Sequence, residues 1–155
     1  MPLKPFLPLA IAATLALGAV AIAQDTPAVV VDPAIATMTN EQLVEARQQA
    51  MEDNGRAMRG AQQLGPTSVD VATLLLQNFT NFPTLFREGS NVPPSKANAA
   101  VWANWDDFKA RFDANIAAST RLLAAAQAND AGAYTAAFQE IAQSCGSCHM
   151  EYRGR

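Results

Sequence analysis

Four segments of the chain place apolar residues three or four positions apart, which is the spacing of a helix with one buried face. The first segment can be capped by residues 39–40, and Gly65-Pro66 ends it. Its apolar stripe consists of Leu43, Ala46, Ala50, Ala57, Ala61 and Leu64. The second segment can begin at residues 67–68, and Pro83 breaks or kinks it. Its stripe consists of Val71, Ala72, Leu75, Phe79 and Phe82.

A loop over residues 89–94, rich in turn residues, separates these segments from two more. The third follows Ser95 and is predicted to be helical from Lys96 to about Ala128. Its stripe consists of Val101, Trp105, Phe108, Phe112, Ile116, Ser119, Leu122 and Ala126. Asn129-Asp130 reverses the chain and caps the fourth helix. The stripe of that last helix consists of Tyr134, Phe138, Ile141, Cys145, Cys148 and Tyr152.

These patterns contain no strand alternation and no internal repeat. Four amphipathic helices with short connections predict an all-α fold, an antiparallel up-down-up-down four-helix bundle. Because two cysteines continue the apolar stripe of the last helix, the group that they bind is expected to lie inside the bundle, near the C-terminal helix.

The first 23 residues have the parts of a secretory signal. Lys4 gives a basic start, an apolar stretch runs from Leu9 to Ala21, and Ala21-Ile22-Ala23 is a small-x-small end. The stretch is shorter than the ~20 apolar residues that span a membrane. We therefore predict cleavage after Ala23, export to the periplasm, and no membrane span in the mature protein. Residues 24–38 are predicted to be a flexible leader, and residues 39–155 a single domain.

Cleavage of residues 1–23 would leave 132 of the 155 residues, enough for one domain with a buried core. The signal holds one of the 11 basic residues and none of the 14 acidic ones, so the mature chain would carry 10 and 14, a net charge of −4. That mild acidity gives no reason to expect nucleic acid as a partner.

The last helix carries the sequence Cys145-Gly-Ser-Cys148-His149, the pattern of a c-type haem attachment site. The two thiols add to the vinyl groups of the porphyrin, and the adjacent imidazole binds the iron. On a helix, residues three and four apart share a face, so all three side chains can meet one flat macrocycle.

Two other uses of these cysteines fit less well. A redox disulfide of this spacing usually accompanies a βαβ pattern, which the sequence lacks. A zinc site needs three or four N/S ligands, whereas the chain has two cysteines and one histidine.

That single histidine also excludes a bis-histidine haem and leaves no distal histidine for peroxidase chemistry. The sequence therefore indicates a protein that is not an enzyme.

Arg47, Met51 and Met58 share a second face of the first helix. A methionine on a helix usually fills a gap in the core. Alternatively, Met51 supplies a thioether to the iron opposite His149, and Arg47, one turn away, pairs with a haem propionate. The third helix offers a similar choice between core packing, which we favour, and a haem-pocket wall for the aromatic cluster Trp102, Trp105, Phe108 and Phe112.

Over essentially the whole mature chain, the sequence resembles the class II cytochromes c, namely cytochrome c prime and its low-spin relatives. The haem motif fits any c-type cytochrome, but its C-terminal position followed by Tyr152-Arg153 is typical of this class. Further matching features are Ala46-Arg47-Gln-Gln-Ala-Met51 in the first helix, Phe82-Pro83 after the second, and Val101-Trp102 with Phe108 and Phe112 in the third.

The resemblance implies one covalent haem c, with Arg153 as the basic residue near the proximal histidine. It also implies two alternatives for the sixth iron position. In the low-spin branch a first-helix methionine binds the iron and the protein carries electrons. In cytochrome c prime a bulky residue covers the iron without binding, and the haem takes small gases. The run from Met51 to Met58 is more similar to the low-spin branch, although methionine also occurs here in five-coordinate members.

We therefore expect a periplasmic one-electron carrier that exchanges electrons with periplasmic redox partners. His149 and Met51 are its expected iron ligands. The alternative is a five-coordinate, high-spin protein that binds nitric oxide or carbon monoxide. The resemblance also implies that the outer faces can pair into a two-fold homodimer.

Overall fold

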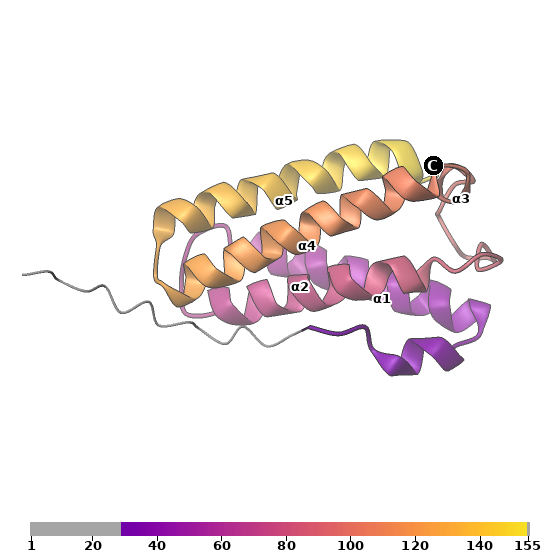
Figure 1. Cartoon of the computed structure of the whole chain (residues 1–155), viewed down its shortest axis with the longest axis horizontal. Coiled ribbons are helices and arrows are strands. Elements are labelled where there is room, and N and C mark those ends of the chain that lie inside the picture. Colours follow the sequence, from indigo (N-terminus) through magenta and orange to yellow (C-terminus); the bar gives the residue numbers. More distant parts are fainter. Residues whose placement is uncertain (1–28, 155) are drawn as a thin grey trace, which may run out of the picture.

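The computed structural model describes residues 29–154. Within this range four long helices run alternately up and down: α1 (Asn40–Gly60), α2 (Ser68–Leu85), α4 (Trp105–Gln127) and α5 (Ala131–Tyr152) (Figure 1). A 3-10 helix, η1 (Pro33–Thr37), precedes them, and a short helix, α3 (Ala100–Ala103), precedes α4. The predicted all-α four-helix bundle is confirmed.

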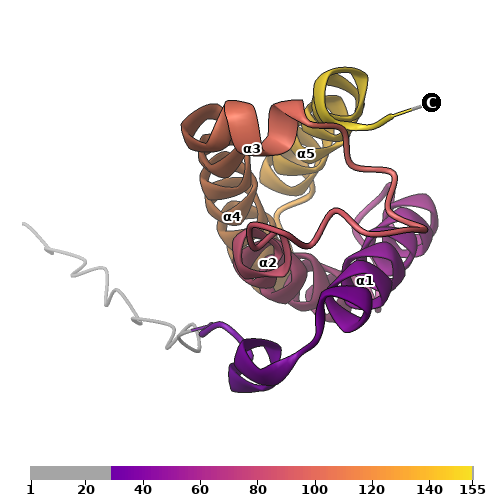
Figure 2. The ribbon, with the colours of Figure 1, turned by 90° about the vertical axis from the view of Figure 1, so that its right-hand side faces the viewer.

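The core of the bundle lies around α2, which packs against α1 on one side and α4 on the other (Figure 2). Helix α4 in turn packs against α5. Aromatic rings fill the α2–α4 contact: the ring centroids of Phe82 and Phe112 are 5.2 Å apart, and those of Phe86 and Phe108 are 4.9 Å apart. Of the helices in the described part of the chain, α2 is the only one against which α1 packs extensively. Its face towards α5 is therefore available to line a cavity.

The helix caps follow from the sequence. Thr39 and Gln42 form a capping box at the start of α1, and the carboxylate of Asp130 accepts hydrogen bonds from two backbone N–H groups at the start of α5. Asn129 makes the reversal before α5 with a φ of 54°, a left-handed conformation that asparagine tolerates better than most residues. The predicted position of this reversal is confirmed.

Two predicted helix boundaries are wrong. The third helix does not begin at Lys96, because the backbone of residues 96–98 bonds to the end of α5 instead. It begins at Ala100, whose N–H is capped by the Asn98 side chain, and it is interrupted at Asn104. The first helix ends at Gly60 rather than near Leu64. Glycine is a weak helix former, so the end of α1 there agrees with its intrinsic preference.

Residues 29–38, the described part of the segment predicted as a flexible leader (24–38), contain regular structure. Residues 33–37 form η1, with the Asp32 side chain as its cap and Ile35 buried against the core. Side chains of α2 hold this segment: Asn81 accepts a hydrogen bond from the Asp32 N–H at 3.0 Å, and Gln77 donates one to the Val30 carbonyl at 3.0 Å.

The predicted signal, residues 1–23, lies outside the described residues. Within residues 29–154, no helix is long and apolar enough to cross a membrane.

One buried hydrogen bond joins the start of α5 to the chain just after α1. The hydroxyl of the fully buried Tyr134 donates to the Ala61 carbonyl, just after α1, at 2.9 Å. Tyr134→Phe keeps the ring but leaves this carbonyl without its donor, so we expect the free energy of unfolding to fall by about 1–2 kcal/mol. Denaturant unfolding measures this effect, and we expect a lower midpoint with an unchanged m value. The control is Thr135→Val, which removes an exposed hydroxyl of the same helix. Equal midpoints in the two variants would contradict this assignment.

Candidate functional site

Helix α5 places Cys145, Cys148 and His149 in its last turns. Both cysteines are half-buried against the core and neither is joined in a disulfide, whereas His149 is exposed. The predicted apolar stripe of α5 is confirmed, since Tyr134, Ile141 and Tyr152 are buried along the same face. The helix therefore places Cys145, Cys148 and His149 at the end of its own buried stripe.

A cavity of about 560 Å³ opens beside this end of α5. Its lining comes from α1, α3, α4, α5 and the segment between α2 and α3. Cys148 and His149 of α5 line it together with Met51 of α1. Cys145 lies one helical turn before Cys148 and is not part of the lining. The structure thus brings the thioether of Met51 to the same cavity as a thiol and an imidazole that follow it about a hundred residues later in the sequence.

Local electrostatics favour the form of the imidazole that binds a metal. Although His149 is exposed, the protein around its ring removes part of its hydration, and this desolvation together with the nearby charge of Arg153 lowers the pKa of His149, which keeps the ring neutral near neutral pH. Burial raises the pKa of both Cys145 and Cys148, so the two thiols stay protonated in the bare polypeptide.

Arg47 of α1 also lines the cavity and is almost completely buried. Its guanidinium donates four hydrogen bonds of 2.8–3.0 Å: to the Leu85 and Ser90 carbonyls and to the Ser90 and Ser95 hydroxyls. It also lies 4.8 Å from the centroid of the Phe86 ring. Within residues 29–154, no acidic side chain forms an ion pair with it. The pairing of Arg47 with a haem propionate stays a prediction. In the structure the Arg47 guanidinium makes four hydrogen bonds to protein groups, which the sequence did not predict.

The charges around the cavity suit a ligand with anionic groups. Among the residues that the structure describes, three cationic side chains, those of Arg47, Lys96 and Arg153, line it with a single acidic one, that of Glu52. The predicted site residue Arg153 is therefore at the cavity, beside the imidazole whose pKa it lowers. Lys96 was not predicted, because it reaches the site only through the pairing of residues 96–98 with the end of α5.

An apolar wall closes the inner side of the cavity. Phe86, Val101, Phe108 and Tyr152 form it, and only Phe108 was considered as a pocket residue from the sequence. Tyr152 could have been found from its place on the α5 stripe, three residues after His149. Phe86 follows α2, where sequence periodicity gives no signal.

These features fit a haem c. The cavity volume lies within the roughly 300–1,000 Å³ that is usual for cofactor sites. An apolar wall suits the porphyrin face, and the cationic side chains suit its two propionates. Cys148 and His149 are in place for attachment and ligation, and Cys145 follows the same stripe one turn away.

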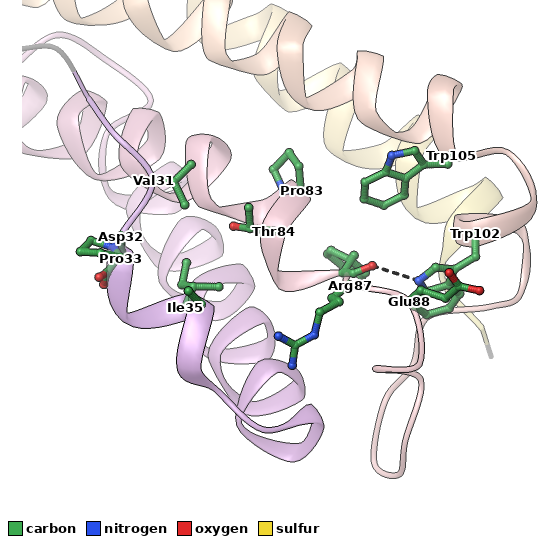
Figure 3. Close-up of a pocket in the computed structure, with 12 residues that line it drawn as sticks. Val31, Asp32, Pro33, Ile35, Pro83, Thr84, Arg87, Glu88, Trp102 and Trp105 are labelled. Atoms are coloured by element: carbon green, nitrogen blue, oxygen red, sulfur yellow. Dashed lines mark hydrogen bonds between the residues drawn. The ribbon is translucent and has the colours of Figure 1, made fainter.

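The remaining members of the aromatic cluster lie elsewhere. Phe112 packs in the core, as favoured from the sequence. Trp102 and Trp105 line a second cavity of about 640 Å³, with Val31, Pro33 and Ile35 on the opposite side (Figure 3). The indole N–H of Trp102 donates to the Phe86 carbonyl at 2.9 Å, and Phe86 lines both cavities.

Comparison with known proteins supports the resemblance found in the sequence. Residues 40–153 match the family model described as Cytochrome C'. A cytochrome c-556 from Agrobacterium tumefaciens (strain II Chrys) is 35% identical over 118 residues, which cover 71% of this chain and 95% of that protein. Among solved structures, cytochrome c' from Thermochromatium tepidum has a TM-score of 0.68 and 22% identity, covering 76% of this chain and 98% of its own.

A second solved structure is a nitric oxide complex of a cytochrome c prime variant from Alcaligenes xylosoxidans. It has a TM-score of 0.62 and 25% identity, and the match covers 76% of this chain and 98% of that one. The chain belongs to the cytochrome c' family and, with the motif Cys145-Gly-Ser-Cys148-His149 at the end of α5, carries one covalent haem c.

Proposed function

We propose that this protein is a periplasmic one-electron carrier, exported through residues 1–23 and without enzymatic activity. Cys145 and Cys148 would hold the haem, and His149 and Met51 would be the two protein ligands of its iron. The observation that carries the proposal is that Met51 of α1 and His149 of α5 line the same cavity. Bound haem supplies a ferric/ferrous couple, and a thioether opposite an imidazole raises its potential.

The protein's own residues limit rearrangement during electron transfer. Met51 and His149 both lie on long helices whose N-termini are capped by side chains, Thr39 in α1 and Asp130 in α5, so their side chains start from defined backbone positions. Arg47 adds a buried positive charge one turn from Met51, which favours the ferrous over the ferric state. Arg47, Lys96 and Arg153 are the residues that we expect to bind the propionates.

A second candidate function is the binding of a small gas at the sixth iron position. It is favoured by the sparse packing of α1 on helices other than α2, which leaves room for Met51 to withdraw. It is also favoured by the nitric oxide complex of the cytochrome c prime variant from Alcaligenes xylosoxidans. In this case Met51 would cover the iron without binding it.

Absorption spectra of the purified haem-loaded protein distinguish the two functions. For the carrier we expect low-spin spectra in both the ferric and the ferrous forms, and slow carbon monoxide binding, because Met51 must first dissociate. High-spin spectra with rapid carbon monoxide binding to the ferrous form would overturn the carrier proposal and support the gas-binding one.

A further inference from the structure

Three side chains meet where the start of α4 touches the end of α5. The hydroxyl of Tyr152 donates a hydrogen bond to Oδ2 of Asp107, and Nε of Arg111 donates to the same oxygen at 2.8 Å. The Arg111 guanidinium also lies 5.2 Å from the centroid of the Tyr152 ring. One carboxylate oxygen therefore holds a donor from each helix.

The protonation states of these groups suit their roles. Hydrogen bonds from Tyr152 and Arg111 lower the pKa of Asp107, and the bond to Asp107 raises the pKa of Tyr152. The carboxylate thus remains an acceptor and the phenol remains a donor across the neutral range.

The ring of Tyr152 connects this cluster to the haem cavity. Tyr152 is buried, its centroid lies 4.9 Å from that of Phe108 in an edge-on contact, and both rings line the cavity. Tyr152 follows His149 by three residues, so the two share one side of the last helical turn. The same turn is held from the other side by Asn98, whose side chain donates to the Glu151 carbonyl at 2.7 Å and whose N–H donates to the Tyr152 carbonyl at 3.0 Å.

We infer that Asp107, Arg111 and Tyr152 form a clamp that positions the last turn of α5 and thereby fixes the orientation of the His149 imidazole on the iron. The three are positioning residues, since none of them binds the metal. The last turn of a helix frays unless other contacts hold it, and in a frayed turn the imidazole would sample several orientations. The inference rests on axial ligation by His149, a part of the proposed function, but not on the carrier role. A high-spin spectrum would overturn the carrier proposal and leave the clamp testable.

Electron paramagnetic resonance of the ferric haem-loaded protein tests the clamp, because its g values depend on the orientation of the axial ligand plane in either spin state. We expect Tyr152→Phe, which keeps the ring as cavity wall, and Asp107→Ala each to shift the g values or add a second set. The double variant is expected to shift them no further, since the residues act as one unit. The matched control is Asp113→Ala, which breaks the exposed 2.7 Å Lys109–Asp113 ion pair of the same helix.

Thermal unfolding of the same four proteins separates positioning from simple stabilisation. A lower Tm in Tyr152→Phe and Asp107→Ala with unchanged g values would overturn the inference, because the network would then only stabilise the fold. Equal g-value shifts in the Asp113→Ala control would overturn it as well. Additive shifts in the double variant would show that the residues do not form a clamp.

Discussion

In the haem-loaded Met51→Ala variant we expect the low-spin spectrum to become high-spin. Alanine has no donor atom, so the sixth iron position would be left to water or to nothing. We also expect the reduction potential to fall by on the order of 0.1 V, within the ~0.8 V over which axial ligands set haem potentials. Carbon monoxide should bind the ferrous variant faster, since no thioether has to leave first. Absorption spectroscopy, potentiometry and stopped-flow mixing measure the three effects.

Helix α1 offers a matched control in Met58. It lies seven residues after Met51, is half-buried like it, and does not line the cavity. Met58→Ala should therefore keep the low-spin spectrum and the potential of the parent protein, while losing a similar amount of buried apolar surface. If the parent protein is already high-spin and Met51→Ala leaves its spectrum unaltered, Met51 is not an iron ligand.

The second large effect is expected from Arg47→Met. Methionine keeps the helix propensity and the apolar stem of arginine but donates no hydrogen bonds. The variant leaves the Leu85 and Ser90 carbonyls and the Ser90 and Ser95 hydroxyls without their shared donor. We expect the free energy of unfolding to fall by about 2–4 kcal/mol, because each buried group left unpaired costs about 1–3 kcal/mol and some can bind water. Tm should fall by roughly 10 °C.

Arg47→Met should also lower the reduction potential, because a buried positive charge near the iron disfavours the ferric state. The control is Arg59→Met, which removes an exposed arginine from the last turn of the same helix and should change neither quantity measurably. A potential that stays constant while Tm falls would mean that Arg47 only anchors the segment after α2. A Tm unchanged from the parent protein would contradict the four hydrogen bonds.

The propionate prediction and the four protein contacts of Arg47 concern different atoms of one side chain. Its two terminal nitrogens, Nη1 and Nη2, make all four hydrogen bonds to the segment after α2. Nε has no partner among residues 29–154 in the structure. A propionate in the cavity could therefore approach Nε and balance a buried charge that no acidic side chain of residues 29–154 balances.

Much of the site was predictable because its signals are local. Cys145, Cys148 and His149 are neighbours in the sequence, so their shared helical face follows from backbone geometry alone. The stripe of α5 and the residues at the caps of α1 and α5 are likewise properties of short segments. The same holds for Met51, which spacing placed on the face of α1 that lines the cavity, although spacing does not decide whether it binds iron.

The residues that sequence reasoning missed depend on contacts between distant segments. Phe86 and Lys96 lie in the irregular segment between α2 and α3, where no period predicts which side chains turn inward. The contact of Tyr152 with Asp107 joins residues 45 positions apart. The burial of Ile35 requires the surface of α2, so residues 33–37 taken alone resemble a leader.

By itself, the sequence determined the four helices, most of their ends and the haem-binding face of the last one, because hydrophobic spacing and capping act within a few residues. Only the tertiary structure decided which surfaces enclose the cavity, where Arg47 donates its hydrogen bonds, and what holds the last turn of α5. Those outcomes depend on how the connecting segments fold back across the bundle, and the free energy of that folding comes from contacts that no short stretch of sequence contains.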